Sequence, residues 1–369
     1  MSEADPAALT QEEAFARIRL LRSPNIGPIS YRQLLRRFGD AARALEALPD
    51  LAGRGGSPYR PAPRERVEAE IAAVRAAGAR YVFRDSPDYP RLLSELETAP
   101  PILVVRGDAV LASRTCVAIV GARNASAAAV KLAREFGAAL SEAGLVVVSG
   151  LARGIDGAAH RGALTGAGGT IGVIASGIDI AYPPEHAELQ DQVACEGLLV
   201  AEQPPGTEPL ARHFPSRNRI IAGLAAGTVV VEAAPKSGSL ITARLAGEAG
   251  REVMAIPGSP LEPRSKGCNQ LIRDGAVLVQ SPEDVIELVE GFAGTPRSTF
   301  RETAPAFEGS FEEAAEPADV AALLTRAPIA VDELIRQSGE PAAAVQLALL
   351  ELELSGKLAR HAGGRVSLA

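Results

Sequence analysis

Short apolar segments alternate with helical stretches between residues 98 and 290, and this alternation constrains the fold more than any other feature. The apolar segments are CVAIV (116–120), LVVVS (145–149), TIGVIA (170–175), LLVA (198–201), TVVVEA (228–233), EVMAI (252–256) and AVLVQ (276–280). They lack an in-and-out pattern of apolar and polar residues, which is typical of strands covered on both faces. The alternation predicts an α/β fold with a doubly wound parallel sheet.

Smaller modules flank this region in a chain of 369 residues. Residues 11–50 contain three helical stretches, and Gly- and Pro-rich residues 53–63 follow them. Residues 317–369 predict three helices, the first over ADVAALLT, and a hairpin that turns at Gly363 and Gly364, which is a winged-helix pattern. The expected divisions are a helical domain, the α/β domain, a linker and a winged-helix domain, at residues 1–85, 86–290, 291–316 and 317–369.

Composition excludes several classes of protein. Hydrophobic residues make up 47% and charged residues 22% of the chain, as in ordinary globular proteins. The longest apolar runs fall short of the roughly 18 residues of a membrane helix, and the acidic start has no apolar signal core. Cys116, Cys195 and Cys268 lie far apart without a CxxC pair, which argues against disulfides and zinc and favours the cytoplasm. We expect no metal and no cofactor.

Four strand-to-helix loops would meet at the carboxyl edge of the sheet, where helix N-termini favour anions. The first follows residue 120 and carries Gly121, Arg123 and Ser126, without the G-x-G-x-x-G pattern of dinucleotide sites. A glycine turn beside a solvated arginine explains it equally well. The second carries Gly150, Arg153 and Gly154 in a glycine-rich segment that suits an anion-binding nest. His160, nearby, is interpreted as a packing residue.

The third and fourth loops add aromatic and basic residues. In the third loop, Phe214 precedes Arg217, Asn218 and Arg219, and Ser216 is the expected helix cap. The phenyl ring of Phe214 suits two roles, stacking on a base or packing in the core. The fourth loop brings Lys236, Ser237 and Gly238 to the start of a helix but lacks the P-loop pattern, so we expect no ATP hydrolysis.

Basic residues at one edge stand out because the domain around them is acidic. Residues 91–290 hold 17 basic and 22 acidic side chains, a net charge of −5. The basic side chains expected at the edge are Arg123, Arg153, Arg217, Arg219 and Lys236. Phosphates are the natural ligand of such an edge. Four acids lie in the same loops and are alternative partners for the cations: Asp156, Asp179, Glu202 and Glu232.

Five long motifs carry a family resemblance. They are VAIVGARNAS, SGLARGIDGAAH, GVIASGIDIAYPPEH, FPSRNRIIAGL and KSGSLITARLAGEAGREVMAIPG. Together, between about Tyr89 and Val285, they closely resemble the bacterial DNA-processing protein A family, also called DprA or Smf.

The resemblance implies an extended Rossmann-like domain that dimerises, flanked by a SAM-like or helix-hairpin-helix domain and a winged helix. It implies a non-enzymatic protein that binds and protects incoming single-stranded DNA and loads the RecA recombinase in natural transformation, competence and recombination. No membrane partner is implied. The DNA-binding residues carried over from the family are Arg123, Arg153, Arg217, Arg219 and Lys236. Together with the other positions of the four loops, the expected DNA-binding residues are Gly121, Arg123, Ser126, Gly150, Arg153, Gly154, Phe214, Arg217, Asn218, Arg219, Lys236, Ser237 and Gly238.

Two other functions stay open from the residues themselves. A Rossmann-type nucleotide hydrolase of the lysine-decarboxylase-like group has a phosphate loop somewhat similar to KSGSL, although its Pro-Gly-Gly-x-Gly-Thr loop is absent here. A protein scaffold would suit the last domain, because the helix expected over 342–354 contains no Lys or Arg and has more apolar residues than one face buries. A scaffold leaves the basic edge unexplained.

Overall fold

The structure is a computed structural model that describes residues 9–53, 59–290, 320–361 and 363–369. These residues form two compact units, one from residues 69–290 and one from residues 9–53 and 59–68 with 320–361 and 363–369. The linker expected over 291–316 lies outside the described residues, and the expected domain boundaries stay predictions.

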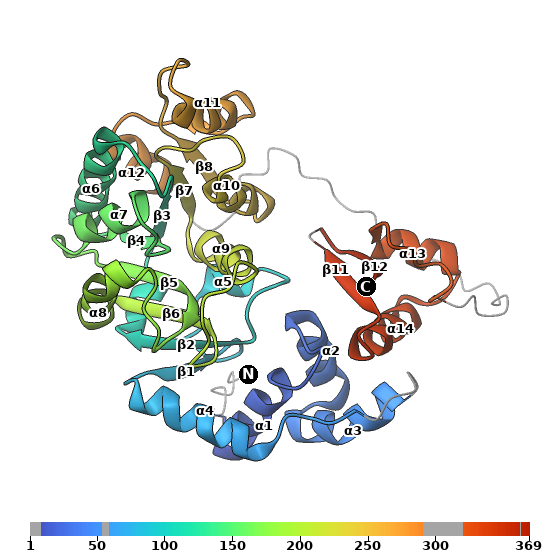
Figure 1. The fold of residues 1–369 in the computed structure, drawn as a ribbon. Coiled ribbons are helices and arrows are strands. Elements are labelled where there is room, and N and C mark those ends of the chain that lie inside the picture. Colours follow the sequence, from blue (N-terminus) through green and yellow to red (C-terminus); the bar gives the residue numbers. More distant parts are fainter. Residues whose placement is uncertain (1–8, 54–58, 291–319, 362) are drawn as a thin grey trace, which may run out of the picture. The chain divides into compact units, whose positions relative to one another are not determined.

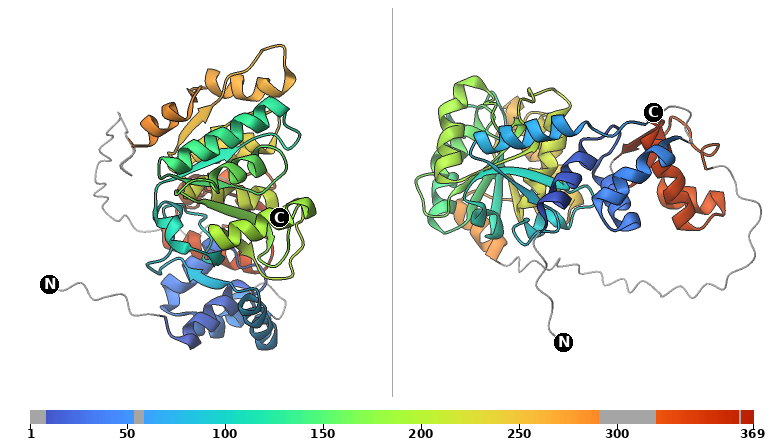
Figure 2. Two further views of the ribbon diagram at one scale, coloured as in Figure 1. Left: turned by 90° about the vertical axis from the view of Figure 1, so that its left-hand side faces the viewer. Right: turned by 90° about the horizontal axis from the view of Figure 1, so that it is seen from below.

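A nine-stranded sheet forms the centre of the larger unit, in the order β1-β2-β6-β5-β4-β3-β7-β8-β9 (Figures 1 and 2). Its strands are β1 (Arg80–Phe83), β2 (Ile102–Gly107), β3 (Cys116–Val120), β4 (Val146–Ser149), β5 (Thr170–Gly177), β6 (Leu198–Gln203), β7 (Gly227–Val230), β8 (Glu252–Ala255) and β9 (Val277–Leu278). The seven predicted strands are present, and all of them pair in parallel. The doubly wound α/β fold is therefore confirmed.

Two strands at one side of the sheet, β1 at the edge and β2 next to it, were not anticipated. β1 pairs with β2, and β2 pairs with β6, both antiparallel. Antiparallel neighbours need no helical crossover between them, so the strand–helix alternation does not mark them.

Helices cover both faces of this sheet (Figure 2). They are α5 (Arg91–Ser94), α6 (Ala127–Glu142), α7 (Ile155–Ala163), α8 (Ala187–Glu196), α9 (His213–Leu224), α10 (Gly238–Glu248), α11 (Lys266–Arg273) and α12 (Pro282–Glu290), with 3₁₀ turns at Ala109–Ser113, Pro184–His186 and Pro263–Ser265. Strand β3 shows why the strand pattern is apolar throughout. Its Val117 and Ile119 pack with Phe136 of α6, whereas Ala118 packs on the opposite face with Ile220 of α9.

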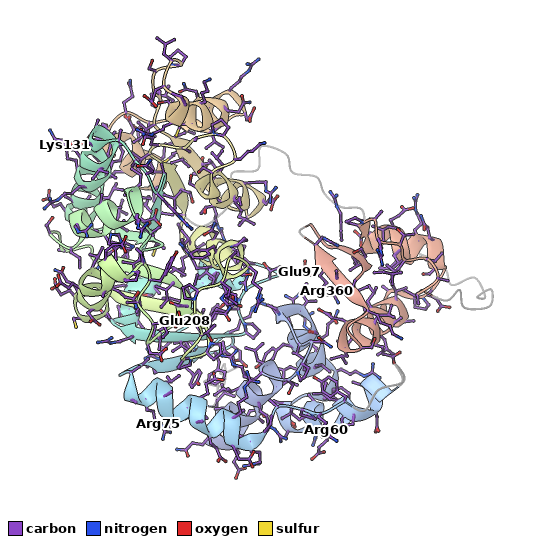
Figure 3. The ribbon with its side chains drawn as sticks, viewed as in Figure 1. Arg60, Arg75, Glu97, Lys131, Glu208 and Arg360 are labelled. Carbon is purple, nitrogen blue, oxygen red and sulfur yellow. The ribbon has the colours of Figure 1, made fainter. Side chains whose placement is uncertain are left out.

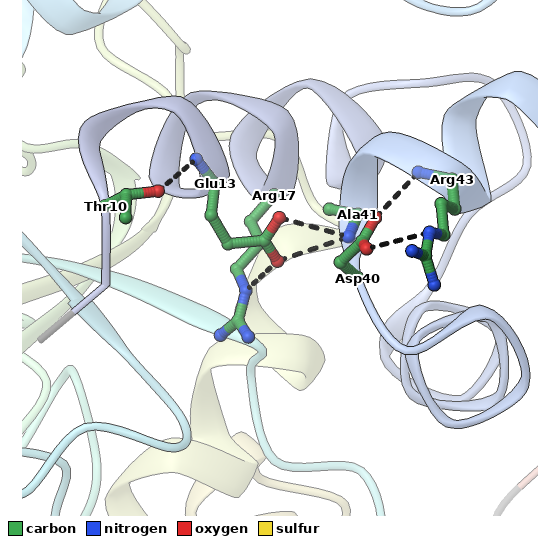
Figure 4. Close-up of polar contacts among 6 residues, drawn as sticks. All are labelled: Thr10, Glu13, Arg17, Asp40, Ala41 and Arg43. Carbon is green, nitrogen blue, oxygen red and sulfur yellow. Dashed lines mark hydrogen bonds and ion pairs between the residues drawn. The ribbon is translucent and has the colours of Figure 1, made fainter. Parts of the chain in front are cut away.

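The smaller unit begins with α1 (Gln11–Leu21), α2 (Pro28–Phe38) and α3 (Ala41–Gly53), and α4 (Arg64–Ala76) crosses the division between the units. Figure 4 shows how α1 and α3 are tied together. Thr10 caps α1 by accepting a hydrogen bond from the Glu13 backbone N–H. The Glu13 carboxylate accepts from Arg17 Nε at 2.7 Å and from the Ala41 N–H at 3.2 Å, so one acid serves both helices.

The C-terminal part of the smaller unit is a winged helix. It contains β10 (Ile329–Ala330), α13 (Val331–Ser338), α14 (Ala342–Leu354), β11 (Leu358–His361) and β12 (Arg365–Leu368). The predicted hairpin is β11–β12, an antiparallel pair beside β10. The helix predicted over ADVAALLT is wrong for its described part, because residues 320–323 form a turn. Among the described residues, no helix combines the length and apolarity that crossing a bilayer requires.

We predict that Gly162 is essential to the contact between α6 and α7. A Cβ at Gly162 would meet the Arg134 carbonyl oxygen at 2.0 Å, so Gly162→Ala should lower the free energy of unfolding by about 2 kcal/mol. Gly247 is exposed on α10, where a Cβ meets Val253 Cγ2 at an ordinary 3.7 Å. Gly247→Ala is the matched control and should raise stability by roughly 0.5–1 kcal/mol. Urea denaturation measures both, and equal effects would refute the close contact.

Candidate nucleic-acid interface

The strand order reverses beside β3, which has β4 on one side and β7 on the other. In open α/β sheets, ligands bind outside the carboxyl ends of the strands at such a point. The loops after β3 and β7 are joined here by two hydrogen bonds: the Ala122 N–H donates to the Glu232 carbonyl at 2.7 Å, and the Ser126 N–H donates to the Glu232 carboxylate at 2.9 Å. Glu232 therefore binds backbone and holds the first and fourth loops together.

A pocket opens at this edge of the sheet and holds about 50 Å³ of free space. Its lining comes from the end of β5, from the loops after β3, β4, β5 and β6, and from the start of α9. The lining residues are Arg123, Gly150, Ala152, Arg153, Ile174, Ala175, Tyr182, Pro183, Pro209, Phe214 and Arg217. Three of the four loops selected from sequence thus meet at one pocket. The fourth loop lies next to them through Asn218 Nδ2, which donates to the Gly238 carbonyl at 3.3 Å.

An aromatic and cationic stack borders the pocket. The Arg123 guanidinium carbon lies 4.8 Å from the centre of the Phe214 ring, a cation–π distance. Tyr182 meets the same ring edge-on, with ring centres 5.7 Å apart, and its side chain is 41% exposed. Phe214 is therefore half-buried between a cation and a second ring and presents apolar surface to the pocket.

Arg217 is buried at the base of this arrangement. A Cβ at Gly150 would meet Arg217 Nη1 at 1.5 Å, so only glycine leaves room for the guanidinium there. Burial lowers the pKa of Arg217 to about 10, and the carboxylate of Asp156 opposes that shift. The guanidinium is therefore charged at neutral pH. Within the described parts of the chain, Arg217 Nε is buried and has no hydrogen-bond partner, so hydrogen bonds compensate this buried cation only in part.

Asp156 is the acid that accompanies Arg217. It lies in the first turn of α7, buried, and accepts a hydrogen bond from the Gly150 N–H at 3.1 Å. Burial raises the pKa of its carboxyl group, while Arg217 and backbone donors act in the opposite direction. Asp156 therefore holds the Gly150 loop in place and partly compensates the positive charge of Arg217.

The remaining basic residues are placed differently. Arg153 lines the pocket but pairs with Glu185, and this pair is largely exposed. Arg219 pairs with Glu202 in a half-buried contact away from the pocket lining. Lys236 is exposed on the fourth loop and has a positive φ of 67°. Of the basic residues selected from sequence, the structure brings Arg123, Arg153 and Arg217 together.

Several other selected residues shape the loops. Gly154 has a φ of 72°, and a Cβ there would meet the Ala122 carbonyl oxygen at 2.3 Å. Ser126 and Ser237 cap α6 and α10 by accepting backbone hydrogen bonds. Gly121 packs closely beside Ile155. These residues build the edge rather than line the pocket.

The start of α9 differs from the sequence prediction. The helix begins at His213, so Ser216 is inside it, where its hydroxyl donates to the Arg212 carbonyl. Arg217 and Arg219 consequently lie in the second turn rather than the first. Arg217 is buried there, and α9 as a whole packs against β5 and α10.

Tyr182 and Glu185 were not selected from sequence. They follow β5 in the segment AYPPEH, which carries a resemblance motif, so a signal for them existed. Their strand has no glycine-rich or basic loop after it, and only the folded chain shows that this loop reaches the pocket.

His160 is fully buried in α7. Its Nδ1 lies 2.8 Å from Thr170 Oγ1, and its Nε2 has no hydrogen-bond partner among the described residues. Burial lowers the pKa of its imidazole to about 3, with His186 and Arg217 adding to the shift. The ring is neutral at physiological pH and packs in the core.

Comparison with known proteins agrees with this architecture. The family model for DNA recombination-mediator protein A matches residues 80–290. The chain belongs to this family. A DprA-like N-terminal HHH domain matches residues 11–73, and a DprA winged-helix domain matches residues 304–364.

Relatives and solved structures extend the match. Protein Smf of Escherichia coli is 37% identical over 312 residues, which cover 83% of this chain and 82% of Smf. DNA processing protein DprA of Streptococcus pneumoniae is 48% identical over 198 residues, 54% of this chain and 70% of that protein. A crystal structure of the pneumococcal protein superposes with a TM-score of 0.63 at 36% identity, over 76% of this chain and 98% of that one.

We predict that His160 makes the larger unit acid-sensitive. An unfolded histidine titrates near pH about 6.5, so below that pH the unfolded chain binds a proton that the folded chain refuses, and stability falls until the pH reaches about 3. The loss between pH 6.5 and pH 5 is about 2 kcal/mol. In the wild type, the free energy of unfolding measured by urea denaturation should be lower at pH 5 than at pH 7.5, and His160→Gln should reduce this difference by the stated amount. His361→Gln, at an exposed position in the other unit, should leave the difference unchanged. An unchanged pH dependence in His160→Gln would contradict the assignment.

Proposed function

We propose that this protein binds single-stranded DNA at the pocket formed by Arg123, Phe214 and Arg217. The observation that carries the proposal is the lining of this pocket, in which the charged Arg217 guanidinium lies with the cation–π pair of Arg123 and Phe214. Cations that meet phosphates, together with aromatic rings that stack on bases, give binding that tolerates any sequence. A solved DNA processing protein A from Helicobacter pylori, described by its single-stranded DNA binding mode, superposes with a TM-score of 0.52 at 27% identity over 58% of this chain and 98% of that one.

The size of the pocket supports an open strand as ligand. Sites that enclose a small molecule hold roughly 300–1,000 Å³, and this pocket holds about 50 Å³. An enclosed mononucleotide does not fit such a space. A strand can lay its backbone over the edge and place one group against Phe214.

Arg123 is the side chain that tests this best, because it is exposed and its replacement leaves the core intact. Arg123→Glu should abolish binding of a short single-stranded oligonucleotide. Arg123→Ala should reduce the slope of log affinity against log salt by about 0.7 for each phosphate that the protein no longer neutralises. Phe214→Ala should cost roughly 1–3 kcal/mol of binding free energy.

Lys131 provides the matched control for these variants. Its side chain lies on α6 (Figure 3), is 79% exposed and pairs with Glu135. Lys131→Ala removes one positive charge from the same domain and should change neither affinity nor slope. A salt titration with fluorescence anisotropy measures all four variants, and a folded Arg123→Glu protein with unchanged affinity would refute the proposed site.

The wider role proposed for the protein follows its family. We propose that it protects incoming single strands and loads RecA onto them in the cytoplasm, in natural transformation and recombination, without catalysing a reaction. The name of the matched family, recombination mediator, supports this role. The basic and glycine positions around the pocket, including Lys236 and Gly238, are proposed to contact the strand or shape its path.

The rival function is nucleotide hydrolysis. The described part of the chain offers no feature that favours it. The pocket is small, and the described residues contain no group of three or more His, Cys, Asp or Glu that could hold a metal ion. Turnover of a nucleoside monophosphate that disappears in Arg153→Ala would favour the hydrolase.

We further propose a homodimer through the Rossmann-like domain. The sheet ends at β9, where Leu278 is 46% exposed, and Leu261, in the segment between β8 and β9, is 90% exposed. Exposed apolar side chains at a sheet edge suit a second copy of the same surface. Sedimentation equilibrium should give a mass near twice the 38.2 kDa of one chain. Leu278→Glu should lower this mass toward that of one chain, whereas the control Val130→Glu, on α6, should leave it unchanged. A wild-type mass of one chain at micromolar concentration would overturn the proposal.

A further inference from the structure

Helix α14 has apolar side chains on two faces. Val345 and Leu349 pack in the core of the winged helix itself, with Leu334 of α13 and Val366 of β12. A helix that is apolar on all sides needs a second partner. In winged-helix proteins that read duplex DNA, the corresponding helix instead presents polar and basic side chains to the groove.

The second face of α14 is covered by the N-terminal helices of the same unit. Leu350 and Leu354 are 3% and 1% exposed and belong to one apolar cluster with Leu34 of α2 and Leu48 of α3. Leu347 packs against the same cluster. The spacing of 347, 350 and 354 places these three leucines on one stripe of the helix, separate from the stripe that fills the winged-helix core.

Polar contacts set the register of this packing. Gln33 Nε2 on α2 donates to Gln346 Oε1 at 2.7 Å. Asn25 Nδ2 donates to the Leu354 carbonyl at 3.0 Å, which satisfies one of the free carbonyls at the end of α14. Directional bonds at both ends of an apolar contact specify one arrangement of the two surfaces.

The polar side chains of the winged helix that could contact DNA are bonded to other residues of the protein. Gln346 is the side chain of α14 most suited to a base edge, and it is bound to Gln33. Glu351 and Glu353 would repel phosphates. Arg360 of the wing forms an ion pair with Glu353, and the two side chains are only 16% and 15% exposed.

We propose that the second face of α14 is a docking surface whose partner is the N-terminal helical domain of the same chain, so that the two end domains form one body and α14 does not read duplex DNA. The surface that the winged helix offers to other molecules is then its remaining exposed part. This inference is independent of the proposed single-strand site, since the two lie in different units.

The test introduces a charge on the second face of α14. Leu350→Glu in the full chain should speed hydrogen exchange in Pro28–Phe38 and Ala41–Gly53 by about tenfold or more, because these helices lose their partner. Ala344→Glu places the same charge at an exposed position of α14 and should leave those helices unchanged. Exchange in α2 and α3 that is identical in the two variants would overturn the proposal.

A cross-link keeps the proposal testable if Leu350→Glu also loosens the winged helix. The Cys195→Ser substitution first removes the exposed thiol. In that background, a short bismaleimide should join the two cysteines introduced by Gln33→Cys and Gln346→Cys within one chain. A product of doubled mass would assign the surface to a second copy and contradict the intramolecular partner, as would the absence of any product. Protection of α14 by duplex DNA in the wild-type chain would also refute it.

Discussion

The burial of one positive charge organises the functional edge of the sheet. Taking a guanidinium out of water is costly unless hydrogen bonds and opposite charge accompany it. Arg217 has the Asp156 carboxylate, in the first turn of α7, as its electrostatic partner, and it occupies the space left by Gly150 in the loop after β4. That loop is folded as it is because Asp156 accepts the Gly150 N–H. The shape of the pocket and its positive character therefore have one common origin.

Acidic partners divide the basic residues of this edge into two groups. Arg219 and Arg153 are paired with carboxylates, whereas Arg123 lies on an aromatic ring and Arg217 retains an unfilled donor. The positive surface that remains is narrower than the sequence indicates.

Both apolar faces of α14 illustrate how the end domains share a core. A small winged helix buries little surface alone, and small domains gain stability by packing against a neighbour. Leu350 and Leu354 extend the core of the N-terminal helices, although more than 300 residues separate them in sequence from α1. The excess of leucine on this helix was visible in the sequence, and its partner was not.

The sequence alone determined the class of fold and the seven parallel strands, because buried strands and crossover helices leave local patterns of apolar residues. It also determined which loops carry cations and glycines. Tertiary structure decided which of those residues meet: it added Tyr182, turned Arg217 inward through the earlier start of α9, and paired Arg219 with Glu202. Such pairings depend on distances between segments far apart in the chain. Local patterns hold no record of those distances, so the packing of the whole domain decides them.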